Sequence, residues 1–210
     1  IAVPKARSER GSLALEVVKN VVDLKDKEIL ELTFPMKKER EDLVESWEEA
    51  ERQVLIHLCE GKDVAFISIG DPLFHSTFIY LMEAIKDGDR ARGSPVSIVV
   101  IPGVSSIHAS TASAKLSLAK SNERVAILPA TYETDKLKET LKGFDTVVLM
   151  KVHRVMDKVV AILEELGLKD KAVFVSKAGW PEEMVVRDLE GLKDKKLDYF
   201  SMVIIKKRGG

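Results

Sequence analysis

Several short loops of this sequence place glycine, proline, serine and charged residues directly after apolar runs that read as strands. They are residues 70–72 (Gly-Asp-Pro), 102–106 (Pro-Gly-Val-Ser-Ser), 150–151 (Met-Lys) and 177–179 (Lys-Ala-Gly). In open α/β sheets, ligands bind beyond the carboxyl ends of the strands, because the loops converge there and helix N-termini present free N–H groups. These loops are therefore our candidates for a shared binding site.

The Gly-Asp-Pro turn offers the most specific chemistry. Gly70 has no Cβ, so a ligand can approach its backbone closely, and Pro72 restricts the turn. Asp71 then presents a carboxylate in a stiff frame, and Ser76 or Thr77 can cap the helix that follows. The same turn is also common in a purely structural role, and Pro-Gly-Val-Ser-Ser reads equally well as a turn with a helix cap. Both interpretations stay open at this point.

Charge and cysteine content argue against several classes of protein. The chain has 33 Lys and Arg against 34 Asp and Glu, so no net field favours nucleic acid or an anionic membrane. Cys59 is alone, and the four histidines are scattered without the spacing of metal ligands, so we expect no protein-bound metal. No apolar run approaches the roughly 20 residues that span a bilayer. We expect a cytoplasmic protein.

Other nucleotide and hydrolase motifs do not occur in the sequence. It contains no G-x-x-x-x-G-K-[ST] phosphate loop, no G-x-G-x-x-G after a strand and no G-x-S-x-G elbow. Phosphoryl, hydride and simple acyl transfer are accordingly disfavoured.

Hydrophobic periodicity predicts alternating strands and helices, which is typical of an α/β architecture. The apolar stripe from Leu43 to Leu58 predicts a helix that ends at Gly61, and the stripe from Phe78 to Ile85 predicts another that stops near Gly88. Further helices are expected at 108–114, 136–141 and 155–166, and strands at 1–4, 64–69, 96–101, 125–128, 146–150 and 172–176. Residues 184–192 and 199–207 look like closing antiparallel strands. The polar stretch 115–124 divides the chain into two predicted domains, 1–118 and 119–210.

Five segments, taken in order, resemble the tetrapyrrole methylase family. They are VAFISIGDPLFHSTFIYL (64–81), VIPGVSSIHASTASAKLSLA (100–119), NERVAILPA (122–130), VVLMKV (147–152) and VSKAGWPEE (175–183). Segments 1–18 and 32–54 resemble those members of the family that methylate carbon C-20 of precorrin-2. The family's N-terminal G-x-G-P-G-D strand-loop is absent, so we expect a segment before Ile1.

The resemblance implies two α/β domains of the tetrapyrrole methylase type, with S-adenosylmethionine in the cleft between them, and a homodimer. It also implies which positions contact the cofactor, namely Gly70, Asp71, Phe74, Ser76, Thr77, Ser106, Ile107, Met150 and Ala178. Main-chain groups and Asp71 would hold the zwitterionic methionine end. Ile107, Met150 and Ala178 would offer apolar surface to adenine and ribose.

The acceptor implied by the resemblance is carbon C-20 of precorrin-2 or of its cobalt-bearing equivalent, a tetrapyrrole of the cobalamin pathway. Such a substrate carries many carboxylates, so its site should present cations. Our candidates are Lys5, Arg7, Arg10, Lys151, His153 and Arg154, although each can equally be an ordinary surface charge. The sulfonium methyl is already electrophilic, and no catalytic side chain is assigned.

Two further interpretations compete with this one. A relative that acts on another ring position, on a protein such as elongation factor 2 or on RNA would share the cofactor motifs, but a balanced charge gives RNA binding little support. A non-catalytic module that only binds S-adenosylmethionine would also fit a sequence without the glycine-rich loop.

Overall fold

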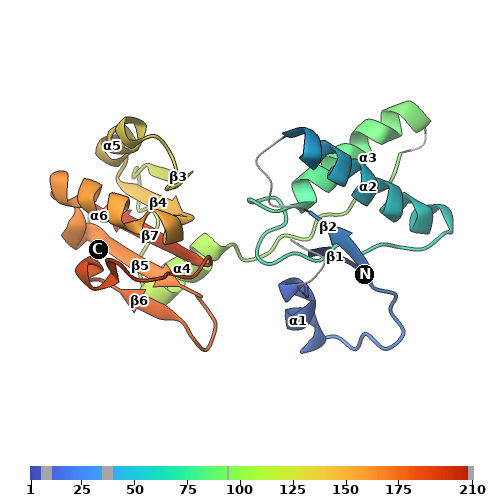
Figure 1. Cartoon of the computed structure of the whole chain (residues 1–210), viewed down its shortest axis with the longest axis horizontal. Coiled ribbons are helices and arrows are strands. Elements are labelled where there is room, and N and C mark those ends of the chain that lie inside the picture. The colour runs from blue at the N-terminus through green and yellow to red at the C-terminus, as the bar shows by residue number, and fades with distance from the viewer. Residues whose placement is uncertain (6–10, 35–39, 94, 208–210) are drawn as a thin grey trace. The chain divides into compact units, whose positions relative to one another are not determined.

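The computed structural model describes residues 1–5, 11–34, 40–93 and 95–207. The chain divides into two compact units, Ile1–Ser105 and Ser106–Gly210 (Figure 1). This division lies at the start of helix α4, ahead of the polar stretch 115–124 in which the sequence places the domain boundary. Both units combine helices with strands, so the predicted α/β class is confirmed.

Unit 1 is built on a short parallel strand pair. Strands β1 (Ala2–Lys5) and β2 (Leu30–Thr33) pair from Ala2 opposite Leu30 to Lys5 opposite Thr33, and helix α1 (Leu13–Lys19) lies between them in the chain. Helices α2 (Arg40–Cys59) and α3 (Phe78–Arg92) contact each other and supply part of the core. The fully enclosed members of this core are Ala2, Leu32, Phe34, Ala50, Val54, Leu81 and Ile85. The N-terminal strand and the helix ending near Gly61 were predicted, whereas β2 was missed.

The predictions of regular strands at 64–69 and 96–101 are wrong. Residues 64–67 lie beside β1 through one bridge, Ala2 opposite Phe66, with the Ala2 N–H donating to the Ala65 carbonyl at 2.9 Å. Residues 96–101 carry no strand assignment, and Val99 is 82% exposed. Val96 and Ile98 nevertheless pack against the core. Every second residue thus faces the core, as expected of extended chain. An apolar run predicts a tendency to be extended, whereas a strand also needs a paired backbone on a neighbour.

Helix α3 continues past the glycine at which it was predicted to stop. A glycine inside a helix costs about 1 kcal/mol relative to alanine, so Gly88 weakens the helix without ending it. The helix ends at Gly93, which has a φ of 66° and donates its N–H to the Asp89 carbonyl at 2.9 Å. This left-handed conformation is the usual glycine C-terminus of a helix.

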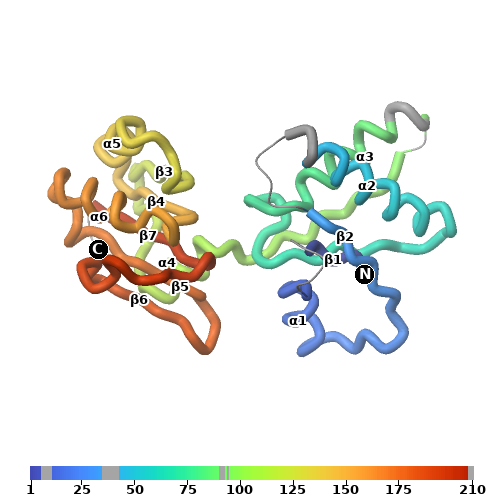
Figure 2. The backbone as a smooth tube through the Cα atoms, viewed as in Figure 1, coloured from blue at the N-terminus to red at the C-terminus, as the bar shows by residue number. Residues whose placement is uncertain are grey.

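Unit 2 is a five-stranded mixed sheet in the order β3-β4-β7-β5-β6. Its strands are β3 (Val125–Pro129), β4 (Thr146–Met150), β5 (Ala172–Ser176), β6 (Met184–Val186) and β7 (Ser201–Lys206). Strand β7 is antiparallel to β4 and β5, and β6 is antiparallel to β5, so two antiparallel strands close this half as predicted. The strand predicted at 184–192 was too long, because β6 ends at Val186 and residues 189–192 form a 3₁₀ turn. The chain path can be followed in Figure 2 from β3, in yellow, to β7, in red.

Both faces of the sheet are covered at its three central strands, which explains why β5 and β7 are buried throughout and why β4 is buried except at Met150. Val147 and Phe174 face helices α5 (Thr134–Gly143) and α6 (Met156–Glu165), whose apolar sides complete one core. The opposite face carries Val148, Val173 and Ile204, each at most 3% exposed, and helix α4 (Ser106–Ala114) contacts β5. Apart from the strand predicted at 184–192, the predicted strands and helices of this half agree with the structure to within about two residues at each end.

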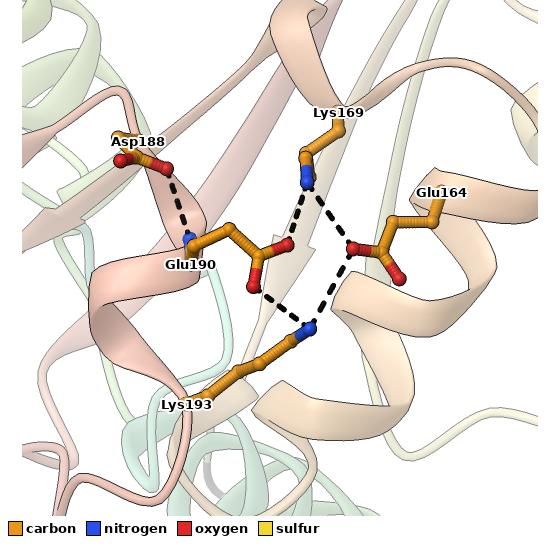
Figure 3. Close-up of polar contacts among 5 residues, drawn as sticks. All are labelled: Glu164, Lys169, Asp188, Glu190 and Lys193. Carbon is orange, nitrogen blue, oxygen red and sulfur yellow. Dashed lines mark hydrogen bonds and ion pairs between the residues drawn. The ribbon is translucent and has the colours of Figure 1, made fainter.

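An ion-pair cluster joins three surface segments of unit 2 (Figure 3). Lys169 of the 3₁₀ turn η2 (Lys169–Lys171) lies 2.6 Å from Glu190 and 3.2 Å from Glu164 at the end of α6. Lys193 lies 2.8 Å from the other oxygen of Glu190, which belongs to the 3₁₀ turn η3 (Leu189–Leu192). Asp188 accepts the N–H of Glu190 and so caps this turn. Within the described ranges, no helix is long and apolar enough to cross a bilayer.

Candidate functional site

Two of the predicted binding loops meet in unit 1. The Asp71 carboxylate accepts the Leu73 N–H of its own turn at 2.9 Å through one oxygen. Its other oxygen accepts the N–H of Gly103, 32 residues further along the chain, at 3.1 Å. Asp71 therefore joins the Gly-Asp-Pro turn to the Pro-Gly turn. The sequence predicted that these loops converge, but not that this carboxylate makes the link.

The two turns are so close that position 103 cannot carry a side chain. A Cβ built on Gly103 would lie 2.3 Å from the Gly70 carbonyl oxygen and 3.0 Å from its carbon. Both neighbours are backbone atoms, which cannot rotate away as a side chain can. Gly70 itself has a φ of 81°, so glycine suits both sides of this contact.

The start of α3 carries the other predicted residues of this loop. Ser76 Oγ accepts the Phe78 N–H at 3.2 Å and lies 2.9 Å from Ser68 Oγ, so the predicted cap is provided by Ser76. Thr77 precedes the helix without a side-chain cap bond. Phe74 is half-buried and its ring meets the His75 ring edge-on at 4.8 Å. His75 has a φ of 53°, an uncommon conformation for a residue other than glycine and one that often marks functional loops.

In unit 2 the predicted loops lie along one edge of the sheet. Strands β3 and β4 are parallel, and β7 runs antiparallel between β4 and β5. Strands β3, β4 and β5 therefore run in the same direction, and their carboxyl ends lie at the same edge of the sheet. Met150 and Ala178 are half-buried there. Lys151 and Lys177, the first residues after β4 and β5, have φ values of 58° and 51°. Both strand exits therefore turn sharply through left-handed backbone, and two of the predicted cofactor positions lie beside these turns.

An aromatic group at the same edge was not predicted. The Tyr199 ring lies 5.3 Å from the His153 ring and 5.4 Å from the Phe200 ring, and Phe200 stacks with Trp180 at 5.9 Å. Tyr199 and Phe200 stay 47% and 41% exposed. The signal was present in the sequence as aromatic residues directly before the last strand, but their side of the sheet depends on the antiparallel return of β7.

The cationic candidates differ in what they can offer a substrate. Lys5 Nζ lies 2.6 Å from Glu31 Oε2 and its side chain is 11% exposed, so a substrate carboxylate would compete with Glu31. Burial lowers the pKa of His153, and the charge of Arg154 lowers it further. His153 is then neutral at pH 7, and its ring is suited to hydrogen bonding rather than to charge pairing. Lys151 and Arg154 are exposed, whereas Arg7 and Arg10 lie outside the described residues.

Helix α4 carries the two remaining cofactor candidates. Ser106 is exposed at its first turn, where helix N–H groups have no partner within the helix. Ile107 is only 3% exposed, so its side chain is buried. Its backbone, rather than the apolar side chain that we expected, is the group that could face a ligand.

Two cavities of unit 1 lie away from these residues. One, of about 680 Å³, is lined by Leu32, Thr33 and residues of α2 that include Glu45, Glu49 and Arg52. The other, of about 570 Å³, is lined by residues that include Ile1, Glu28, His57 and Lys62. In the described part of the chain, no group of three His, Cys, Asp or Glu side chains could hold a metal ion.

Comparison with known proteins gives one consistent result. The sequence profile of the tetrapyrrole (corrin/porphyrin) methylases matches residues 5–192. The chain is 35% identical to a probable cobalt-precorrin-2 C(20)-methyltransferase of Methanocaldococcus jannaschii, over 99% of this chain and 84% of the relative. It is 31% identical to the cobalt-precorrin-2 C(20)-methyltransferase of Salmonella typhimurium, over 98% of this chain and 84% of the relative.

The fold comparison agrees. The crystal structure of a cobalt precorrin-4 methyltransferase, CbiF, superposes with a TM-score of 0.65 at 22% identity, covering 98% of this chain and 83% of that one. At 22% identity, this match is evidence for the fold alone. Together with the profile and the curated relatives, it shows that the chain belongs to the tetrapyrrole methylase family.

Proposed function

We propose that this protein is an S-adenosylmethionine-dependent methyltransferase that methylates C-20 of precorrin-2 or cobalt-factor II in cobalamin biosynthesis. The observation that carries the proposal is the similarity to two C(20)-methyltransferases over nearly the whole chain. A further relative, the precorrin-2 C(20)-methyltransferase of Sinorhizobium sp, is 31% identical over 72% of this chain and 59% of the relative, and its name does not include cobalt. The proposal therefore includes both forms of the ring.

The loops of each unit fit the parts of the cofactor assigned to them. In unit 1, the turn at 70–77 offers backbone groups and a carboxylate for a zwitterionic amino-acid end, and no Cβ blocks approach to Gly70. In unit 2, Met150 and Ala178 offer half-buried apolar surface at the strand ends, which suits adenine and ribose. We propose contacts from Gly70, Asp71, Phe74, Ser76, Thr77, Ser106, Ile107, Met150 and Ala178.

The chemistry asks the protein mainly for orientation. When bound, S-adenosylmethionine supplies a methyl group that is already a good electrophile. The protein's part is then to hold the acceptor carbon in line and to exclude water, and orientation can supply roughly 7–11 kcal/mol in favourable cases. No nucleophilic side chain is required, and we assign no catalytic residue.

Substrate binding would use cations around these loops. Lys151 and Arg154 are exposed after β4 and can pair with ring carboxylates. His153 would donate or accept a hydrogen bond in its neutral form. Lys5, Arg7 and Arg10 remain proposed contacts from the N-terminal segment. We also propose a cytoplasmic homodimer that binds neither nucleic acid nor membrane.

A binding and product assay tests this function. Calorimetry with S-adenosylmethionine is followed by incubation with precorrin-2 or cobalt-factor II and mass spectrometry of the tetrapyrrole. A gain of one methyl group, located at C-20 by NMR, is the expected result. Methylation at another carbon would assign the protein to another ring position. Cofactor binding without any product would favour a non-catalytic binding module, and absence of binding would refute the proposal.

A further inference from the structure

Glu183 folds back onto the loop that follows β5. Its Oε2 accepts the Gly179 N–H at 2.6 Å and lies 2.7 Å from Ser113 Oγ on α4. Gly179 has a φ of 81°, and Lys177 at the start of the loop has a φ of 51°. One carboxylate thus connects a loop of unusual backbone conformation to a helix of the same unit.

The hydroxyl of Ser113 can be assigned a direction. Ser113 Oγ lies within hydrogen-bonding distance of the Ala109 carbonyl, at 3.1 Å, and of Glu183 Oε2. A hydroxyl has one hydrogen, and an ionised carboxylate is the stronger acceptor. Bonds from Gly179 and then Ser113 lower the pKa of Glu183, so the carboxylate is ionised at neutral pH. We therefore assign the hydrogen to Glu183.

A second contact fixes the same helix end. Arg187 donates from its guanidinium to the Ala114 carbonyl, the last residue of α4, at 3.0 Å. The segment after β5 is thus attached to α4 at two successive residues, Ser113 and Ala114. The loop at 177–179 lies between β5, which is fully buried, and this attachment.

We propose that Glu183 is a positioning residue that holds Ala178 and Gly179 in the conformation in which this loop contacts S-adenosylmethionine. The inference rests on the proposed function, because it takes Ala178 as a cofactor contact. Without the carboxylate, the Gly179 N–H loses its acceptor and the left-handed turn loses its support. The free loop then samples other conformations, and the free energy needed to order it lowers the affinity for the cofactor. Glu183 acts through the loop and need not touch the cofactor.

The test uses the full chain and compares Glu183→Ala with Glu183→Gln. Because hydrogen bonds to charged groups are among the stronger ones, Glu183→Ala should weaken S-adenosylmethionine binding about tenfold by calorimetry. Glu183→Gln keeps an amide oxygen that can accept the Gly179 N–H, and should weaken binding less than about threefold. In steady-state assays, KM for the cofactor should rise while kcat and KM for the tetrapyrrole stay unchanged.

The adjacent Glu182, which is exposed, provides the matched control. Glu182→Ala removes the same charge one residue away and should bind the cofactor as the wild type does. Normal cofactor affinity in a folded Glu183→Ala protein would overturn the positioning role and leave the proposed function intact. So would an equal loss in both KM values with a lower Tm, since that pattern indicates general destabilisation. Wild-type protein that binds no cofactor would instead refute both proposals.

Discussion

At the scale of single residues, the close contact between Gly103 and the Gly70 carbonyl means that position 103 has no room for a side chain. A methyl group at position 103 would lie 2.3 Å from that oxygen, so the two turns would have to separate. The Asp71 bond to the Gly103 N–H would be lost with them. Because the atoms nearest to this methyl group belong to the backbone, no side-chain rotation can relieve the clash, and the backbone itself must move.

We therefore expect Gly103→Ala to destabilise the protein by about 1–3 kcal/mol, the usual cost of overpacking, and to weaken cofactor binding. Urea denaturation and calorimetry measure the two effects. Gly143→Ala is the control, because a Cβ there meets nothing within 4 Å. That variant, at the end of α5, should be neutral or gain up to about 1 kcal/mol from better helix propensity. Equal stability of the two variants would contradict the close approach.

His153 gives a second residue-scale prediction. Its pKa is lowered from 6.5 by burial and by Arg154, so the neutral ring contributes stability above pH 6.5 that is lost as pH falls through the folded-state pKa. NMR titration of the ring protons should show His153 titrating below the usual value, and His153→Gln should remove that signal. A His153 that titrates above 6.5 would instead support the charged role that the sequence suggested.

The conformation of the two turns in unit 1 was largely predictable from their residue types, and the contacts of their side chains were not. Glycine, proline and aspartate at a strand exit indicate a stiff turn, and the pairing of residues 70–72 with 102–106 followed from the rule that strand exits converge. That Asp71 uses both oxygens on backbone N–H groups depends on a contact 32 residues away. Likewise, the burial of Ile107 and the exposure of Tyr199 and Phe200 depend on which face of a helix or sheet is covered. A local sequence pattern does not encode this.

At the scale of elements, strands covered on both sides by paired neighbours were predicted best. The runs 146–150 and 172–176 coincide with β4 and β5, because each is apolar, short and bounded by polar residues. The run 96–101 is equally apolar, yet Val99 and Ile101 are 82% and 79% exposed. β2 was missed because only Leu30 and Leu32 of its four residues are apolar. Composition thus predicts a tendency to be extended, while pairing decides whether a strand forms.

The ion-pair cluster at the ends of α6, η2 and η3 gives an element-scale prediction (Figure 3). Lys169 and then Lys193 lower the pKa of Glu190 from 4.5 to about 2. A depressed carboxyl pKa adds stability that is fully present above pH 4.5 and is lost as pH falls through about 2. Glu190→Gln should therefore lower Tm at pH 7 by a small amount, about 2 °C, because these side chains are largely exposed.

Two conditions identify the cause of that shift. The Tm difference between wild type and Glu190→Gln should shrink in 1 M salt, where the Debye length is about 3 Å, and should shrink again between pH 4.5 and 2. Glu182→Gln removes the same charge outside the cluster and should leave Tm unchanged. A difference that persists in high salt and at low pH would show that packing, not charge, is responsible.

At the scale of the whole molecule, the two units differ in how much regular structure supports them. The described part of unit 2 has a continuous five-stranded sheet with helices on both faces, whereas that of unit 1 has one strand pair and a single further bridge. Sheets of three or more strands with a covered apolar face are stable by themselves, and two-stranded pairs are not. We expect unit 2 to be the more stable half.

Fragments of the chain test this and locate the boundary. A fragment of residues 106–210 keeps α4 against β5, while a fragment of 119–210, the domain that the sequence predicts, removes α4. It also removes the partners of Glu183 and Arg187 on that helix and the contact of α4 with β5. The longer fragment should unfold cooperatively in calorimetry with an enthalpy of about 60–80 kcal/mol, as expected for 100 residues. The shorter one should unfold at lower temperature and bind an apolar dye. Equal Tm values for the two fragments would place α4 with the first half of the chain and support the boundary near residue 118.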